Sequence, residues 1–104
     1  MVELLSDLVD IDSNSFDKAG VDRVGARLTA FFDDNEIQHE TIPLEEYGDA
    51  IRAVVSGGDG NQPILLCGHR DTVFPTGEVE KRPFSIADGK AFGPGVADMK
   101  PGLV

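Results

Sequence analysis

The stretch that decides the fold is PILLCGHRDTV, at residues 63–73. Its first half is a short, continuous apolar run at residues 64–67, bounded by Pro63 and Gly68. A run of this length without alternation is typical of a strand that is buried on both faces of a sheet. We therefore predict a central strand at 64–67, in which Cys67 is a small buried hydrophobic side chain rather than a metal ligand.

The residues before this strand predict two helices. Apolar side chains at helical spacing predict a short amphipathic helix over residues 2–9. A polar loop at residues 12–15 follows it, and a second helix is predicted from about Asp17 to Asp34. Gly25 lies inside this second helix, where glycine costs about 1 kcal/mol, so it predicts close packing against a neighbour.

Several shorter segments predict β structure and turns. Residues 37–44 and 50–55 are typical of strands, and the glycine-rich run at 56–61 predicts a turn after them. Ala87, Asp88 and Gly89 predict a hairpin turn between two short strands. We expect His39, on the first of these polar strands, to face solvent.

The order of these elements indicates an α/β fold, with a mixed sheet flanked by helices. Residues 99–104 predict the opening of a further helix, with Pro101 in its first turn. No repeat or linker divides the chain, so residues 1–104 are expected to form one unit. A helix that opens at the last residues indicates a fragment of a longer domain.

The composition excludes some classes of partner. Nineteen acidic residues against nine basic ones give a formal net charge of −10. Nucleic acid and anionic membranes both require a basic surface, so neither is an expected partner. Most of this charge is explained by solubility, and a cation-storage or adaptor module has only the net charge in its favour.

The single cysteine, the lengths of the apolar runs and the first twelve residues together predict a cytoplasmic location. A single cysteine, Cys67, rules out an internal disulfide and fits a reducing compartment. No apolar run approaches the ~20 residues of a membrane span. The first twelve residues lack the basic region that opens a signal peptide.

The first group of chemically active residues directly follows the predicted strand. Residues two apart in an extended segment point the same way, so His69 and Asp71 are expected to face one cavity and Arg70 to face away. Ligands in open α/β sheets bind beyond the carboxyl ends of strands, which favours this placement. A metal-bound imidazole usually donates its other N–H to a carboxylate or carbonyl. By itself, such a pair is more often an ordinary surface contact.

The second group lies in FGPGVADMKPG, residues 92–102. Its glycines and prolines predict a constrained loop in which Asp98 immediately precedes the last predicted helix. Asp98 is either the N-cap of that helix or a hard oxygen ligand that can bridge two metal ions. Lys100 either approaches the same site or is an exposed charge in the first helical turn.

In order and separation, these motifs resemble a family of zinc-dependent metallopeptidases and amidohydrolases. The family includes bacterial glutamate carboxypeptidase, acetylornithine deacetylase, succinyl-diaminopimelate desuccinylase and the aminoacylases. The resemblance rests on residues 65–73, 83–84, 89–90 and 92–100, and more loosely on the loop at residues 11–13.

The resemblance implies a role for each matching residue. His69 would bind one zinc ion, and Asp71 would be the catalytic carboxylate that supports His69. Asp98 would bridge two zinc ions, which cobalt could replace, and would precede a cis peptide bond to Met99. Arg70 departs from the family pattern, since many relatives carry an apolar or neutral residue there.

The resemblance also implies a function for the parent protein. It would be a homodimeric two-zinc hydrolase that cleaves an amide or peptide bond adjacent to a free carboxylate, in a small peptide or an N-acyl amino acid. Residues 1–104 would be the N-terminal portion of its catalytic domain, with the general base, the other ligands and a dimerisation or lid domain lying elsewhere. The alternative is an inactive fragment or non-enzymatic remnant, because three candidate residues cannot fill two tetrahedral zinc sites.

Overall fold

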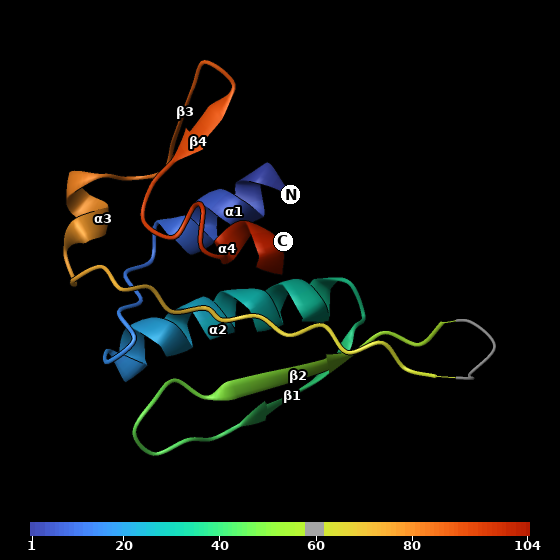
Figure 1. Cartoon of the computed structure of the whole chain (residues 1–104). Helices are drawn as coiled ribbons and strands as arrows, with labels where there is room; N and C mark the ends of the chain where they lie inside the picture. Colours follow the sequence, from blue (N-terminus) through green and yellow to red (C-terminus); the bar gives the residue numbers. More distant parts are fainter. Residues whose placement is uncertain (58–61) are drawn as a thin grey trace.

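The computed structural model describes residues 1–57 and 62–104, which form short helices and two small sheets (Figure 1). Strands β1 and β2 form one two-stranded antiparallel sheet, and β3 and β4 form another. This combination confirms the predicted α/β class. Of the turn predicted at 56–61, residues 58–61 lie outside the described residues. The element bounds are α1 (Val2–Val9), α2 (Lys18–Asp34), β1 (Gln38–Ile42), β2 (Ala50–Val54), α3 (Glu78–Lys81), β3 (Ser85–Ala87), β4 (Lys90–Phe92) and α4 (Lys100–Leu103).

The core lies between α1 and α2. Leu4 and Leu8 of α1 pack against Val24 and Leu28 of α2, and all four side chains are buried. Both predicted helices are therefore confirmed, together with the apolar stripes that predicted them. The second begins after Asp17, whose carboxylate accepts a hydrogen bond from the Gly20 amide at 3.1 Å as an N-cap. In every described helix, length and hydrophobicity fall short of what a membrane crossing requires.

Helix α2 carries the β1–β2 sheet on its other side (Figure 1). Gly25 allows this approach, because a Cβ atom there would lie 3.1 Å from Cζ of Arg70 and 3.1 Å from Cδ1 of Ile51. The close packing predicted at Gly25 is thus confirmed. His39 of β1 does not face solvent as predicted: its Nε2 lies 2.9 Å from Oδ1 of Asp33, and its ring is 5.7 Å from that of Phe32. These two contacts leave only 19% of its side chain exposed.

The β3–β4 hairpin and helix α4 also match the sequence predictions. Asp88 and Gly89 have φ angles of 51° and 71°, and the type I′ turn of a two-residue hairpin requires positive φ at both positions. Helix α4 begins after Met99 and carries Pro101 in its first turn. In Figure 1, α4 lies beside α1, while the hairpin projects away from the helices.

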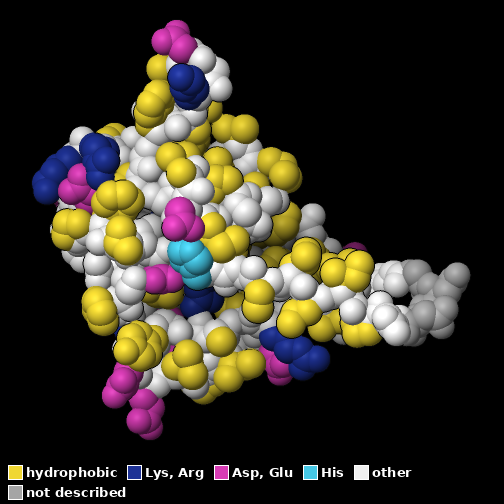
Figure 2. Space-filling model, viewed as in Figure 1, with side chains coloured by type: hydrophobic (Ala, Val, Ile, Leu, Met, Phe, Trp, Pro, Cys, Tyr) yellow, Lys and Arg dark blue, Asp and Glu magenta, His cyan; other side chains and the backbone are white. Residues whose placement is uncertain are grey.

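The prediction of a buried central strand at 64–67 is wrong. Ile64, Leu65 and Leu66 are 88%, 85% and 88% exposed, and Cys67 is exposed as well. The segment extends alongside α2, and no strand among the described residues pairs with it (Figure 1). Figure 2 shows hydrophobic side chains lying open on this part of the surface. A hydrophobic run indicates that burial would be favourable, but it does not supply the neighbouring strand and covering side chains that bury it.

Lys100 takes neither position that the sequence suggested, because it is completely buried. Its Nζ donates hydrogen bonds to the carbonyl oxygens of Leu8 at 2.7 Å and Ile11 at 3.0 Å. Carbonyls at the carboxyl end of a helix lack partners within the helix and attract cations. Burial lowers the pKa of Lys100 to about 8, although the carboxylates of Asp12 and Asp10 oppose this change. Lys100 therefore fastens the start of α4 to the end of α1.

Substitutions of Lys100 test how much its contacts with α1 contribute to the free energy of unfolding. Lys100→Ala removes the hydrogen bonds to the Leu8 and Ile11 carbonyls and leaves a cavity where the lysine was completely buried, so the free energy of unfolding should fall by about 3 kcal/mol. Lys100→Met should cost less than Lys100→Ala, because its apolar side chain fills most of the volume that the lysine stem occupies. Urea denaturation at neutral pH would measure both variants. Unchanged stability in Lys100→Ala would contradict the structural role of this lysine.

Candidate metal centre

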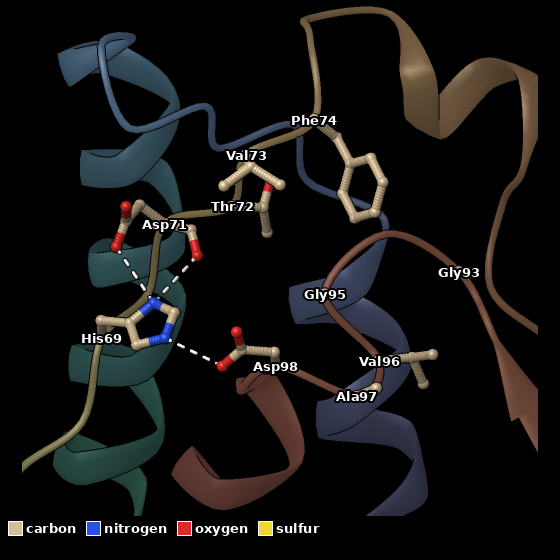
Figure 3. Close-up of a pocket in the computed structure, with 10 residues that line it drawn as sticks. All are labelled: His69, Asp71, Thr72, Val73, Phe74, Gly93, Gly95, Val96, Ala97 and Asp98. Atoms are coloured by element: carbon tan, nitrogen blue, oxygen red, sulfur yellow. Dashed lines mark hydrogen bonds and ion pairs between the residues drawn. The ribbon is translucent and has the colours of Figure 1, made fainter.

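Two loops meet to form the pocket that holds the predicted site residues (Figure 3). One loop follows the extended segment and contributes His69 and Asp71. The other precedes α4 and contributes Asp98. The pocket has a volume of about 230 Å³. The remaining lining residues are small or apolar apart from Thr72: Val73, Phe74, Gly93, Gly95, Val96 and Ala97.

His69 lies between the two aspartates, and each of its ring nitrogens contacts one of them. Nδ1 is 3.2 Å from Oδ1 of Asp71 and also 3.2 Å from the Asp71 carbonyl oxygen. Nε2 is 3.1 Å from Oδ1 of Asp98. Figure 3 shows these contacts, and Figure 2 shows a histidine between acidic side chains on the same face. The structure thus brings together all three residues that the sequence singled out, across 29 positions of the chain.

The neighbours of these residues also lie as the sequence predicted. Arg70 faces away from the pocket, and its Nη2 donates to the carbonyl oxygen of Asp49. Met99, rather than Asp98, is the N-cap of α4, so the cap alternative for Asp98 is not realised. The peptide bond between Asp98 and Met99 is cis, as the family resemblance implied.

The electrostatics of the site favour a protonated His69 when no metal is bound. Burial of the imidazole opposes protonation, but the contacts with Asp98 and Asp71 outweigh it and raise the pKa of His69 above its usual 6.5. Burial alone would raise the pKa of Asp71. The hydrogen bonds from Ser15 and His69 instead hold it below its usual 3.8. Asp71 is thus an anion that accepts hydrogen bonds, which is the form that orients a metal-binding histidine.

The donor atoms fit part of a zinc site. Two ligand atoms bound tetrahedrally to zinc at the usual bond lengths lie about 3.4 Å apart. The observed 3.1 Å between His69 Nε2 and Asp98 Oδ1 is close to this separation. Asp71 lies on the Nδ1 side of the ring, so it is placed to support the histidine rather than to share a metal ion with Nε2. Accordingly, residues 1–57 and 62–104 contain no group of three or more His, Cys, Asp or Glu side chains that could hold a metal ion.

Sequence reasoning missed one residue that touches the site. Ser15 Oγ donates a hydrogen bond to Oδ2 of Asp71, from a position 56 residues earlier in the chain. The loop at residues 12–15 was recognisable only as a polar turn, and a serine in such a loop carries no pattern that identifies a distant partner. The nearest signal was the loose family resemblance at residues 11–13.

Three relatives of known function resemble the chain. Acetylornithine deacetylase of Pasteurella multocida is 44% identical over 64 residues, covering 59% of this chain and 17% of the relative. Carboxypeptidase G2 of Pseudomonas sp. is 32% identical over 98% of this chain and 25% of the relative. Acetylornithine deacetylase of Salmonella arizonae is 32% identical over 95% of this chain and 28% of the relative. No protein-family model matches the chain.

By name, two of these relatives are acetylornithine deacetylases and one is a carboxypeptidase. The chain belongs to the family of acetylornithine deacetylase and carboxypeptidase G2, as its motifs suggested. It spans between 17% and 28% of the length of the relatives that it matches.

The raised pKa of His69 can be tested in the metal-free chain. Because the folded pKa lies above that of the unfolded chain, the contacts of His69 stabilise the fold below about pH 6.5. This stabilisation is lost as the pH rises through the folded value. Asp98→Asn removes one anionic partner and should lower the pKa of His69, whereas Asp88→Asn, in the exposed hairpin turn, should not change it. NMR titration of the imidazole resonances measures this, and an identical pKa in wild type and Asp98→Asn would contradict the described contact.

Proposed function

We propose that this chain forms part of the metal site of an amide hydrolase, with His69 and Asp98 as metal ligands and Asp71 as the carboxylate that orients His69. The observation that carries the proposal is the approach of His69 Nε2 to Asp98 Oδ1 at 3.1 Å, with Asp71 on the opposite ring nitrogen. A histidine nitrogen and a carboxylate oxygen are both ordinary zinc ligands. Family membership supports the same assignment.

Each of the three residues has a separate task in this proposal. Asp71 accepts a hydrogen bond from Nδ1–H of His69, which favours this tautomer and leaves the lone pair of Nε2 facing the pocket. Asp98 supplies an anionic oxygen beside that lone pair. The chemistry that a bound zinc or cobalt ion supplies at such a site is Lewis-acid polarisation of an amide carbonyl.

The proposed substrate is a small peptide or an N-acyl amino acid, cleaved at an amide bond adjacent to a free carboxylate. Support comes from the names of the relatives, since one is a carboxypeptidase and two are deacetylases of an acetylated amino acid. The described lining of the pocket includes no lysine or arginine. These lining residues therefore offer no lysine or arginine side chain to the substrate carboxylate. A homodimeric, cytoplasmic parent enzyme belongs to the same proposal.

The 104-residue chain alone should bind metal weakly and should not turn over substrate. Two donor atoms converge in the pocket, whereas a zinc ion takes four ligands. We therefore assign the hydrolase activity to the longer proteins of this family and a contributing role to this chain.

Zinc titration by calorimetry tests the ligand assignment. The wild-type chain should bind zinc with measurable but low affinity, and His69→Gln or Asp98→Asn should weaken binding about tenfold or more. Asp88→Asn removes the same charge from an exposed turn away from the pocket and should bind as the wild type does. Equal weakening by Asp98→Asn and Asp88→Asn would indicate loss of general acidity rather than loss of a site, and unchanged binding in His69→Gln would likewise reject the assignment.

An activity assay tests the predicted inactivity of the chain. The purified chain, loaded with zinc or cobalt, should release no product from an N-acetyl amino acid or from a peptide that ends in glutamate. Chromatography of the reaction mixtures detects the free amino acid. Robust, zinc-dependent turnover that disappears in His69→Gln would show that the chain is an enzyme by itself, contrary to this expectation.

A further inference from the structure

The Asp71 carboxylate is held from two sides. Its Oδ1 faces Nδ1 of His69 at 3.2 Å, and its Oδ2 accepts a hydrogen bond from Oγ of Ser15. About a third of the Asp71 side chain is exposed, so burial alone does not fix its rotamer. The Asp71 oxygen that does not face His69 therefore has a hydrogen-bond donor of its own, Ser15.

Ser15 is itself fixed by its backbone. Its N–H donates to the carbonyl oxygen of Thr72 at 3.0 Å, and the Thr72 N–H donates to the carbonyl oxygen of Ser13 at 2.7 Å. These bonds form a parallel bridge centred on Asn14, whose Nδ2 also donates to the carbonyl oxygen of Phe74 at 3.0 Å. The loop before α2 is therefore bonded on both sides of Asn14, up to and including Ser15, to the segment that carries Asp71.

The single hydroxyl proton of Ser15 has two acceptors within reach. The Thr72 carbonyl oxygen lies 3.4 Å away, while the Asp71 carboxylate oxygen is much closer. Hydrogen bonds to a carboxylate are about twice as strong as those to a neutral oxygen. The proton of Ser15 is thus directed to Asp71.

We propose that Ser15 is a positioning residue of this site: its hydroxyl orients Asp71, and Asp71 in turn selects the tautomer of His69 that carries its proton on Nδ1. In the metal-free chain Asp98 competes for the same proton, because its Oδ1 lies 3.1 Å from Nε2, so the hold of Ser15 on Asp71 shifts the balance between the two tautomers. The importance of Nε2 as a ligand rests on the proposed function above. The effect of Ser15 on the His69 tautomer does not rest on the proposed function, because it can be measured in the metal-free chain.

The chain offers matched variants for a test. Ser15→Ala removes the hydroxyl. Ser15→Thr keeps it, and a pocket of about 440 Å³ beside Ser15, lined in part by Phe16 and Tyr47, leaves room for the additional methyl group. Ser13→Ala is the control in the same loop: Ser13 is buried, and its Oγ has no hydrogen-bond partner among the described residues. Removing an unpaired buried hydroxyl should not destabilise the fold.

The experiment is nitrogen NMR of the metal-free chain labelled with ¹⁵N-histidine, at a pH above the titration of His69. Ring nitrogen shifts distinguish the two tautomers, and His39→Gln identifies the resonances of the other histidine. Wild type, Ser15→Thr and Ser13→Ala should show the same ratio of the Nδ1–H form of His69 to the Nε2–H form. In Ser15→Ala this ratio should fall on the order of fivefold, the loss expected for one net hydrogen bond of about 1 kcal/mol.

An unchanged ratio in Ser15→Ala, or an equal change in Ser13→Ala, would overturn the proposal. If Ser15→Ala does not fold, as judged by circular dichroism, Ser15→Cys replaces it, because a thiol has similar size but is a weak donor. The zinc titration separates the two proposals. Zinc binding through His69 without a tautomer change rejects only the role of Ser15, whereas a tautomer change without zinc binding rejects only the proposed metal function.

Discussion

The polar groups at and just after the carboxyl end of α1 hold the rest of this structure in place. Helix ends leave carbonyls unpaired, and here they are paired by residues from distant parts of the chain. The buried ammonium group of Lys100 donates hydrogen bonds to the carbonyl oxygens of Leu8 and Ile11. The residues after α1 also accept hydrogen bonds from distant backbone amides. The carboxylate of Asp10 accepts from Phe84 at 2.6 Å, and that of Asp12 accepts from Gly77 at 2.6 Å. The carbonyl oxygen of Ser13 accepts from Thr72 at 2.7 Å.

This anchoring explains why His69 and Asp98 meet although neither lies in a long helix or in a sheet. His69 is three residues before Thr72, and Asp98 is two residues before Lys100. Thr72 and Lys100 both bond to the segment from Leu8 to Ser13, so the two loops start from a common support. The approach of Nε2 to Oδ1 is therefore a consequence of backbone and lysine contacts that do not involve the side chains of His69, Asp71 or Asp98.

The sequence predicted those elements that depend on interactions between residues close together in the chain. Helical periodicity and capping placed α1 and α2, and the Asp88-Gly89 turn placed the β3–β4 hairpin. The approach of His69 and Asp98 was predicted only because two motifs together resembled a family. The burial of Lys100 escaped prediction, because lysine is rarely fully buried and nothing near it in sequence identifies α1 as its partner. The exposure of residues 64–67 was not predicted either. An apolar run indicates that burial would be favourable, but it does not identify the strands or side chains that would cover it.

The central claim is that His69 Nε2 and Asp98 converge on one metal position while Asp71 stays on the opposite side of the ring. The most direct measurement is the anomalous scattering of zinc in crystals of the chain grown or soaked with zinc. We predict one peak between His69 and Asp98, about 2.0–2.2 Å from Nε2 and from a carboxylate oxygen of Asp98. A peak bound to Nδ1 between His69 and Asp71, or no peak near His69 while zinc occupies acidic residues elsewhere, would contradict the claim.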